Sequence, residues 1–416
     1  MSTKTLNNRK KEQLMPILRF EDMKEKWLLI TLDDLLTFKN GLNASKEKYG
    51  KGTKFINVLD IINNVFITHD NIIGSVEVSE KEQEKNEVVY GDILFQRSSE
   101  TREEVGQTNV YLDKSRKCVF GGFVIRGHKK KEYDPLFMNY LLKTQKVRKE
   151  ITTKSGGSTR YNIGQDSLRE VAVYTTSLPE QKKIASFLST IDEKILQLTR
   201  KKELLETYKK GLMQQLFSGA LRFKDEKGKD YPDWEERRLG DVGEIVSGLT
   251  YSPNDINEQG VLVLRSSNVK NRQLVFNDNV YVKTSSFNPV KLNDILICVR
   301  NGSKRLIGKN ALISEDVVGV AFGAFMSVYR SKYNLFISHY FDTEAYKKEV
   351  HKNLGATINS INGSNLKQFK IPFPSEKEQK HIADLLFQIR GKITTITTQI
   401  TKTKTFKKGL LQQMFV

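Results

Sequence analysis

The chain has little cysteine, proline and histidine, and it has no long apolar run. Of its 416 residues two are cysteine, eight are proline and five are histidine. The longest nearly unbroken apolar stretch, Gly319 to Val328, is far shorter than the ~20 residues that a membrane-spanning helix needs. The first residues, MSTKTLNNRKKEQ, lack the apolar core of a signal peptide. The sequence therefore predicts a cytoplasmic protein without a membrane span.

The two cysteines and the five histidines give no sign of a disulfide or a metal site. Cys118 and Cys298 form no C-x-x-C pair, and we expect both to be buried, reduced thiols. The histidines are scattered and show no metal-ligand spacing. The expectation is a chain that holds no metal.

Catalytic motifs are also missing. The segment GSKRLIGKN, residues 302–310, has five residues between its glycines where a phosphate loop has four, and Asn310 replaces the Ser or Thr that would bind Mg²⁺. Pro232-Asp233 lacks the acidic-x-Lys partner of a nuclease site, and no adenine methyltransferase N-P-P-aromatic run occurs. No Ser-His-Asp or Cys-His set is recognisable. The sequence predicts a protein that is not an enzyme and carries no cofactor.

What the chain does have is positive charge. Lys and Arg exceed Asp and Glu by 19, and the sequence pI is about 9.5. Such an excess is typical of a surface that meets a polyanion, and it favours nucleic acid as a partner. Generic solubility, or a lysine-rich genome, is the alternative explanation of the charge alone.

The sequence is also an internal repeat. KKGLMQQLF, residues 209–217, returns as KKGLLQQMF, residues 407–415, an interval of 198 positions. The same interval relates Glu180-Gln181 to Glu378-Gln379, and earlier segments echo one another with a small drift. Phe120-Gly121-Gly122-Phe123 answers Phe322-Gly323-Ala324-Phe325, where we interpret the glycines as sites of a bulge or close packing. The chain is two copies of one unit.

Each copy ends in a predicted long helix. Ser177 with Glu180, and Ser375 with Glu378, have the S-x-x-E spacing of a capping box. Apolar residues then recur in alternating steps of four and three over more than four heptads, from Ile184 to Leu216 and from Ile382 to Met414, which predicts a coiled coil. We favour antiparallel pairing of the two helices, which gives the copies a twofold relation. Gly211 and Gly409, inside the helical pattern, indicate close helix contact there or with another subunit.

The segments before the helices show a mixed pattern. Short β-like runs alternate with Gly, Asn and Asp turns, and helical stretches follow at Leu136–Ile151 and Leu335–Val350. We therefore predict an α/β or α+β fold. The expected organisation is an N-terminal arm (1–26), a first globular domain (27–176), a first helix (177–219), a linker (220–233), a second globular domain (234–373) and a second helix (374–416).

Polar and basic residues follow the repeated framework strands, in loops that differ between the copies. Arg and Asn can read guanine and adenine edges, whereas Lys and Ser mainly hold phosphates. A solvated loop is the plain alternative for any one of them. As a set the candidates for DNA contact are Arg97, Ser98, Ser99, Lys154, Arg160 and Tyr161 in the first copy, and Arg265, Ser266, Ser267, Asn268, Arg300, Asn301, Ser303, Lys304 and Arg305 in the second.

Taken together, these motifs resemble the specificity subunit of type I restriction–modification systems. The resemblance rests on the LRF…W lead-ins (Leu18–Trp27 and Leu221–Trp234), the GDIL and NDIL strands and the G-S-T and G-A-T junctions. It continues in LPEQKKIA and SEKEQKHIA and in the KKGL-x-QQ-x-F helix ends. It covers the chain from about residue 14. The two lead-ins differ in length, so the N-terminal domain edge is not fixed by it.

The resemblance implies two target-recognition domains held apart by two antiparallel helices, each domain binding one half of an asymmetric, bipartite site in double-stranded DNA. It also implies partners: two modification subunits that methylate adenine with S-adenosylmethionine, and restriction subunits that use ATP and Mg²⁺. We expect the partner-docking residues at Gly211, Gln214, Gln215, Gly409, Gln412 and Gln413. The alternative is a non-catalytic coiled-coil scaffold that does not read DNA sequence, and a stand-alone DNA enzyme is a further rival.

Overall fold

The computed structural model describes residues 15–354 and 359–416. It divides into two compact units, which are described separately. Unit 1 comprises residues up to Arg200 together with Thr397–Val416, and unit 2 comprises Lys201–Ile396. The predicted G-A-T junction, Gly355 to Thr357, and most of the predicted N-terminal arm lie outside the described residues.

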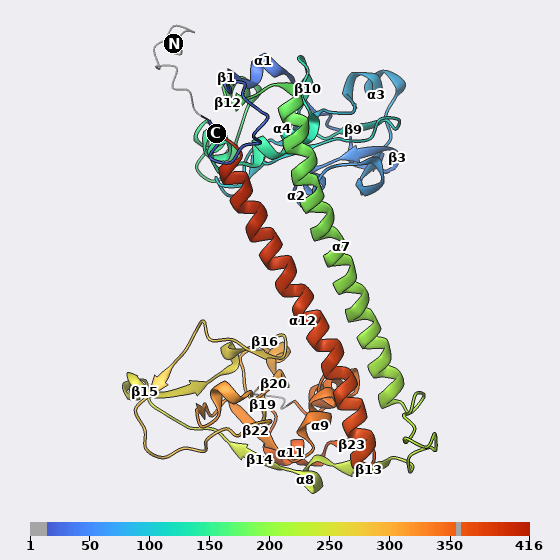
Figure 1. Ribbon diagram of the computed structural model, residues 1–416, viewed down its shortest axis with the longest axis vertical. Coiled ribbons are helices and arrows are strands. Elements are labelled where there is room, and N and C mark those ends of the chain that lie inside the picture. The colour runs from blue at the N-terminus through green and yellow to red at the C-terminus, as the bar shows by residue number, and fades with distance from the viewer. Residues whose placement is uncertain (1–14, 355–358) are drawn as a thin grey trace. The chain divides into compact units, whose positions relative to one another are not determined.

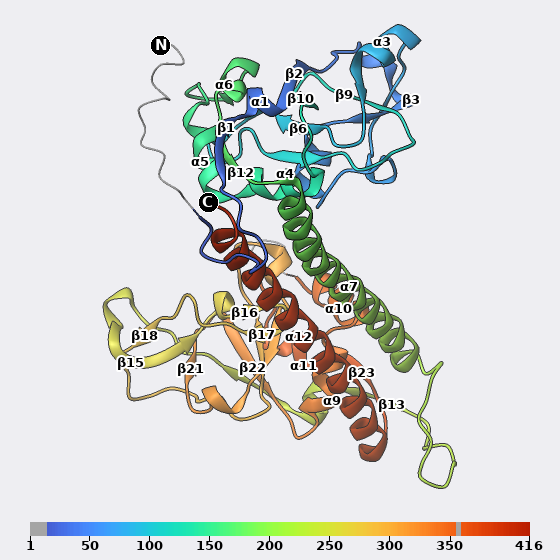
Figure 2. The ribbon, with the colours of Figure 1, turned by 45° about the horizontal axis from the view of Figure 1, so that its top comes forward.

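Unit 1 is built on two four-stranded sheets (Figure 2). The first is antiparallel, in the order β2 (Leu36–Asn40), β10 (Val124–Lys129), β6 (Ile93–Gln96), β8 (Thr108–Val110). The second has the order β4 (Ser75–Val76), β3 (Tyr49–Ile56), β9 (Cys118–Phe120), β5 (Glu87–Val88), and its β3–β9 pair is parallel. β1 (Leu28–Thr31) pairs with β12 (Ala172–Thr175). The short helices are α1 (Leu32–Leu35), α2 (Val58–Asn63), α3 (Glu80–Asn86), α4 (Pro135–Lys143), α5 (Gln145–Thr153) and α6 (Gln165–Arg169).

Unit 2 repeats this plan. Its antiparallel sheet runs β14 (Glu244–Ser247), β22 (Met326–Arg330), β19 (Ile295–Cys298), β20 (Asn310–Leu312). A second sheet holds β18 (Tyr281–Val282), β15 (Ile256–Leu264) and β21 (Ala321–Phe322), again with a parallel pair, β15–β21. β13 (Glu235–Arg238) pairs with β23 (Lys370–Phe373), and β16 (Val269–Lys270) with β17 (Gln273–Leu274). The short helices are α8 (Leu239–Val242), α9 (Asn334–Tyr340), α10 (Glu344–Lys352) and α11 (Gly363–Gln368). The predicted mixed α/β repeat is thus confirmed.

Each predicted helix of the globular segments is in fact two helices. Thr144 has an extended backbone, with ψ 148°, and separates α4 from α5. In unit 2 the extended Thr343 starts α10, and its hydroxyl accepts a hydrogen bond from the backbone of Tyr346. The apolar spacing continues across both breaks, which is why the sequence pattern alone does not reveal them.

The two long helices, α7 (Leu178–Phe217) and α12 (Glu376–Gln413), contribute to both units (Figure 1). In unit 1, Ile184 and Leu188 at the start of α7 share a core with Met414, just beyond the end of α12. In unit 2, Leu216 at the end of α7 shares a core with Ile382 at the start of α12. Within each unit the two helix segments therefore run in opposite directions, as predicted. One continuous coiled coil along both helices stays a prediction.

The predicted capping boxes are wrong as regards their glutamates. Glu180 and Glu378 are completely buried and do not reach back to the helix caps. Glu180 accepts two hydrogen bonds from Arg19, at 2.7 and 2.8 Å. Glu378 accepts two from Arg222, at 3.1 and 2.8 Å. An arginine about 160 residues away in the chain outcompetes the local backbone, because a buried carboxylate needs an opposite charge.

The expectations for the cysteines and for Gly121 are confirmed. Cys118 and Cys298 are buried free thiols. A side chain at Gly121 would come within 2.6 Å of the Phe55 ring, so the glycine does mark close packing. Among the described residues, no helix is long and apolar enough to cross a membrane.

Candidate nucleic-acid interface

In unit 1 the folding chain brings three distant loops together. β7 (Ser98–Ser99) pairs with β11 (Tyr161–Asn162), with Ser99 opposite Tyr161. The amide of Arg97 donates to the carbonyl of Phe123 at 2.8 Å, and the amide of Ile163 donates to the carbonyl of Arg97 at 3.0 Å. We call residues 97–99, 121–123 and 160–162 loop cluster 1. Most of the predicted first-copy residues thus lie on one continuous surface.

These residues are not equally free to meet a ligand. Arg160 is exposed, and Arg97, Ser98 and Tyr161 are half-buried. Ser99 is buried, and its hydroxyl is 3.1 Å from a Glu104 carboxylate oxygen. Ser99 therefore holds the loop and faces no ligand. The predicted Lys154 lies outside the cluster, with its Nζ 3.4 Å from Glu170 and 3.9 Å from Glu150.

Unit 2 has a corresponding surface. The short 3₁₀ turn Ser266–Asn268 lies beside the segment that leads into a second 3₁₀ turn, Lys304–Leu306, because the side-chain amide of Asn301 donates to the Ser266 hydroxyl at 3.2 Å. Arg300 forms a backbone bridge with Ser360, and its guanidinium lies 5.7 Å from the centre of the Phe325 ring. We call residues 265–267, 300–305, 323–325 and 359–360 loop cluster 2.

Here too some predicted residues are structural. Asn268 is completely buried; it accepts from the Arg265 amide at 2.9 Å and donates to the Val275 carbonyl at 3.0 Å. Arg265 is paired with Asp278 at 2.9 Å, and Asn301 accepts from the Ser303 amide at 3.0 Å.

Three members of cluster 2 are free to bind. Ser267, Lys304 and Arg305 are exposed, and neither cation forms an ion pair with any residue that the structure describes.

The structure also shows which residues of the two clusters correspond. The amides of Arg97 and Val299 both donate to the carbonyl of an exposed phenylalanine, Phe123 in one unit and Phe325 in the other. Arg97 is therefore equivalent to Val299, and Arg300 is equivalent to Ser98. The two phenylalanines, Asn162 and Ser360 are cluster residues that sequence reasoning missed. The FGGF and FGAF echo is the signal that could reveal the phenylalanines, although its glycines by themselves indicate only a bulge or close packing.

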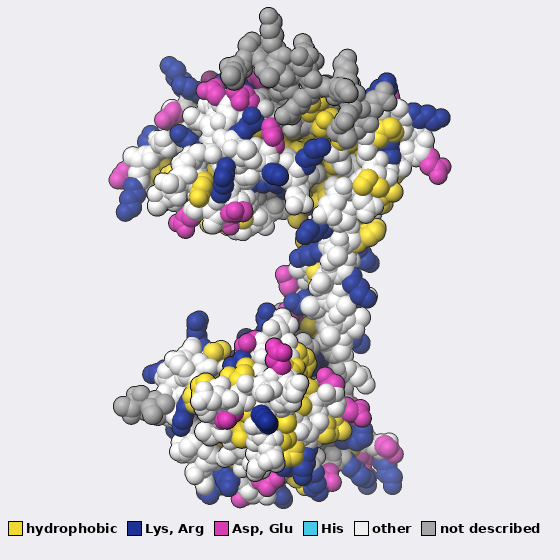
Figure 3. Space-filling view, turned by 90° about the vertical axis from the view of Figure 1, so that its left-hand side faces the viewer, with side chains coloured by type: hydrophobic (Ala, Val, Ile, Leu, Met, Phe, Trp, Pro, Cys, Tyr) yellow, Lys and Arg dark blue, Asp and Glu magenta, His cyan; other side chains and the backbone are white. Residues whose placement is uncertain are grey.

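On the face drawn in Figure 3 the positive charge is not gathered in one patch. Lys and Arg side chains are scattered across the visible faces of both units, with Asp and Glu among them (Figure 3). Many of the cations are engaged in surface ion pairs, which contribute little to stability. The free cations of the loop clusters are thus a better guide to a nucleic-acid surface than net charge.

The repeated KKGL-x-QQ-x-F segments divide by face. Their apolar residues are buried in the cores: Leu212 and Leu216 in unit 2, Leu410 and Met414 in unit 1. Each helix end thus packs on the globular domain of the other copy. The side chains of Gln214, Gln215, Gln412 and Gln413 are exposed and form no hydrogen bond with a described residue. A Cβ at Gly211 or Gly409 would meet nothing described within 4 Å, so neither glycine permits a close contact within its own unit.

The first lysine of each segment forms a half-buried ion pair, and its partner differs between the two units. Lys407 binds Asp192 of α7 at 2.6 Å, and the Tyr140 hydroxyl donates to the same carboxylate at 2.8 Å. The position of α12 equivalent to Asp192 is Arg390, so Lys209 binds Asp342 of the globular part instead, at 2.6 Å. In both units the lysine is thus paired with an aspartate, which comes from a long helix in unit 1 and from the globular part in unit 2.

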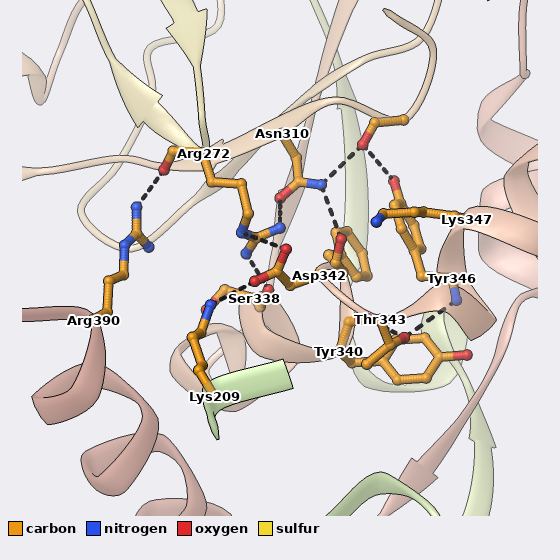
Figure 4. A network of polar contacts seen from close by, with 12 residues as sticks. Lys209, Arg272, Asn310, Ser338, Tyr340, Asp342, Thr343, Tyr346, Lys347 and Arg390 are labelled. Carbon is orange, nitrogen blue, oxygen red and sulfur yellow. Dashed lines mark hydrogen bonds and ion pairs between the residues drawn. The ribbon is translucent and has the colours of Figure 1, made fainter. Parts of the chain in front are cut away.

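Asp342 is the centre of a polar network in unit 2 (Figure 4). Arg272 lies 3.6 Å from its carboxylate and donates to Asn310 at 2.7 Å. Burial raises the pKa of Asp342, but Arg272 and Lys209 outweigh it and hold that pKa below its ordinary value. Asn310 is buried and also donates to the Gly308 carbonyl at 2.9 Å. Asn310, which stands where a phosphate loop has Ser or Thr, therefore has a structural role.

These features define a class of protein: a duplicated α/β chain in which two long helices support two diverged loop clusters. The family model for the type I restriction modification DNA specificity domain matches the chain twice, at residues 24–207 and 231–403. The chain belongs to this family of type I restriction–modification specificity subunits.

Individual relatives agree with the family. The chain is 26% identical over 381 residues to a Methanocaldococcus jannaschii protein assigned as the MjaX type I restriction enzyme specificity subunit, covering 88% of this chain and 87% of the relative. It is 28% identical over 276 residues to the MjaVIII specificity subunit of the same organism (63% and 64% covered). It is 27% identical over 188 residues to the EcoKI specificity subunit of Escherichia coli (42% and 39% covered).

The solved structures show the same fold. The S subunit of a type I restriction–modification system from M. genitalium superimposes with a TM-score of 0.62, at 17% identity, covering 97% of this chain and 99% of that one.

Proposed function

We propose that this chain gives a type I restriction–modification complex its DNA sequence specificity, each loop cluster reading one half of an asymmetric, bipartite site. The observation that carries the proposal is the pairing itself: two equivalent surfaces on one repeated framework that differ in nearly every polar residue. Arg97 is replaced by Val299 and Ser98 by Arg300 at equivalent positions. Surfaces that differ in their hydrogen-bonding groups select different base pairs, which makes the site asymmetric.

The long helices set the separation of the two half-sites in this proposal. A helix of 40 residues, such as α7, is ~60 Å long at 1.5 Å per residue. Two DNA-binding domains held apart in this way recognise two short sequences that are separated by a spacer whose bases neither domain contacts, as paired binding modules generally do.

The exposed face of the repeated segments is the proposed docking site for two modification subunits. We call Tyr208, Gly211, Gln214 and Gln215 on α7, with Phe406, Gly409, Gln412 and Gln413 on α12, the docking face. Tyr208 and Phe406 are equivalent positions and are 57% and 58% exposed. An aromatic, a glycine and unpaired amides on one helical surface suit a second helix that approaches closely.

Replacing Gly211 with Leu and both Gln214 and Gln215 with Ala tests the docking face. We expect less complex with the modification subunit on size-exclusion chromatography, while DNA binding by the complex that does form is unchanged. Lys201→Ala, on an exposed position of the same helix, is the control. Equal losses of assembly and of DNA affinity would count against this assignment.

In this proposal the chain itself is not catalytic. Modification subunits carry S-adenosylmethionine and methylate adenine, and restriction subunits carry ATP and Mg²⁺ and cleave unmodified DNA. The assembly works on DNA in the cytoplasm. Methylation of DNA by the purified chain alone would contradict this division of labour.

The function can be tested with a pool of duplexes of random sequence. The chain, assembled with its modification subunits, is used to select bound duplexes over several rounds. The proposal predicts two different conserved blocks at a constant separation. Enrichment without a common sequence, or no enrichment, would favour a coiled-coil scaffold that binds only proteins.

A further inference from the structure

Each loop cluster exposes one phenylalanine at the same place. Phe123 is 63% exposed and Phe325 is 58% exposed. Each ends a four-residue motif whose first phenylalanine, Phe120 or Phe322, is buried in a parallel strand pair. Packing explains the buried member of each motif and does not explain the exposed one.

The turn that carries each exposed ring is fixed. In unit 1 the Val124 amide donates to the Gly121 carbonyl at 2.8 Å, and in unit 2 the Met326 amide donates to the Gly323 carbonyl, also at 2.8 Å. Both phenylalanines are thus the third residue of a tight turn that precedes a central strand of the sheet. Single exposed apolar side chains are ordinary on protein surfaces. The same one, held in the same turn in two otherwise diverged loop clusters, needs a reason.

The backbone of each phenylalanine is also part of the recognition loops. Its carbonyl accepts the amide of Arg97 at 2.8 Å in unit 1, and the amides of Val299 and Arg300 at 3.0 and 3.1 Å in unit 2. The Arg97 guanidinium is 3.4 Å from the carbonyl of Gly122, in the same turn. A ligand that binds either loop cluster therefore lies next to the phenylalanine ring of that cluster.

We propose that Phe123 and Phe325 are specificity residues, each making the apolar contact of its loop cluster with the C5-methyl group of a thymine in its half-site. This inference rests on the proposed DNA recognition. A thymine methyl is the apolar group that base pairs present in the major groove, and phenylalanine is one of the side chains that meet it. In the proposed function the modification subunits methylate adenine, and every adenine to be methylated is paired with a thymine on the opposite strand.

For Phe325 the geometry favours a methyl contact over insertion of the ring between base pairs. An inserted wedge separates two stacked bases and needs both of its faces free. One face of the Phe325 ring is covered by the Arg300 guanidinium, 5.7 Å from the ring centre. The remaining face and edge are enough for a methyl group.

Deoxyuridine, which lacks the C5-methyl group, provides the test. Duplexes carrying the selected bipartite sequence are prepared with each thymine in turn replaced by deoxyuridine, and dissociation constants are measured for the complex of this chain with its modification subunits. In each half-site we expect one replacement to weaken binding about fourfold, the effect of removing one buried methyl group. Phe123→Ala and Phe325→Ala should each weaken binding by at least that factor.

The decisive result is the combination of variant and base change. Phe123→Ala should be insensitive to the replacement in one half-site and keep the sensitivity in the other, and Phe325→Ala should do the reverse. Leu335→Ala, which alters another exposed apolar residue of unit 2, should behave as wild type. The inference is overturned if the wild-type complex tolerates every replacement, or if the losses from variant and replacement multiply.

Two further outcomes separate this inference from the proposed function. If either phenylalanine variant loses assembly with the modification subunits while the complexes that form bind DNA normally, the rings contact protein and the inference falls. If the wild-type complex does not distinguish the selected sequence from a scrambled duplex, the proposed function fails as well.

Discussion

At the scale of single residues, the buried glutamates explain why the LRF…W lead-in and the EQ-x-x-IA motif occur together. Glu378 accepts from Arg222 and from the indole nitrogen of Trp234, the latter at 2.9 Å. Glu180 is held by Arg19 in the same way. Burial raises the pKa of Glu180, but its hydrogen bonds with Arg19 and Thr176 bring the pKa below its ordinary value. These residues join each helix to the segment that precedes its domain.

Glu378→Gln should be strongly destabilising, because it removes the buried partner charge of the Arg222 guanidinium and leaves only the exposed Asp233 carboxylate, at 3.5 Å. Removing one member of a buried ion pair costs roughly 3 kcal/mol or more. The matched control is Glu376→Gln, two residues earlier, whose pair with Lys332 is exposed and whose loss should therefore change the stability little. Thermal unfolding checks this prediction: similar melting temperatures for the two variants would contradict it.

His339 should make unit 2 sensitive to acid. It is buried against the Phe387 ring, and burial, with Arg272 and Lys209 nearby, lowers its pKa to about 3. The unfolded chain takes up a proton on this histidine near pH 6.5, whereas the folded chain does not until about pH 3. Between these values the unfolded state binds more protons, so stability falls as the pH decreases.

The contribution of His339 can be isolated by substitution. His339→Leu should flatten the fall in the free energy of unfolding between pH 6.5 and 4.5, by up to about 1.4 kcal/mol per pH unit. Denaturant unfolding of both proteins at several pH values measures the difference. Parallel curves for variant and wild type would show that this histidine is not held neutral.

At the scale of elements, the two long helices could be predicted from sequence, and most of what holds them could not. The apolar spacing from Ile184 to Leu216 indicates both the helix and its buried side. The ion pairs of Lys209 and Lys407 join residues 133 and 215 positions apart, and no local pattern reports such a partner. The exchange of Asp192 for Arg390 between the copies makes the point clearly, since the same lysine is paired differently in each.

The glycines of the helices give a prediction at this scale. Because a Cβ at Gly211 or Gly409 has room, Gly→Ala at either position should raise the stability of the free chain by about 1 kcal/mol. If the docking face is correct, the same change should weaken assembly with the modification subunit. Melting temperature and complex formation are measured on the same variants. If a variant is neither more stable nor weaker in assembly, the proposed role of these glycines in docking is contradicted.

The loop clusters show the limit of residue type as a guide. Ser98 and Ser99 are neighbours of identical type, yet one faces the cluster surface and the other is buried against Glu104. Successive side chains of a β-strand point to opposite faces of the sheet, so when one of two neighbouring residues faces the solvent the other faces the interior. The sequence could identify loops that lie together in the structure, and it could not predict which residues in them are exposed.

At the scale of the whole molecule, the free cations of loop cluster 2 should act through phosphate charge. Lys304→Ala and Arg305→Ala each remove one exposed cation with no described partner. Each should weaken binding to specific and random duplexes by a similar factor and lower the salt dependence of log Kd by about one. Titration of the assembled complex at several salt concentrations measures this. An unchanged salt dependence would place both residues away from the DNA backbone.

The duplication is the feature of the whole chain that the sequence showed most fully, because a nearly constant interval separates residues that the fold makes equivalent, 198 positions in the long helices and 202 between Arg97 and Val299. For each half, the sequence predicted the mixed α/β class and not the order of the strands. The parallel pairs β3–β9 and β15–β21 join strands about sixty residues apart, and each contains as few as two paired positions. Pairing that is so short and so distant leaves no periodicity in the sequence.

The central claim is that this chain determines which DNA sequence its complex modifies. The most direct measurement maps methylated adenines across the genome in cells with and without the gene, with the modification subunit present and its expression confirmed in both. The account predicts that one asymmetric, bipartite motif is methylated only when the chain is present. An unchanged methylation pattern would contradict it.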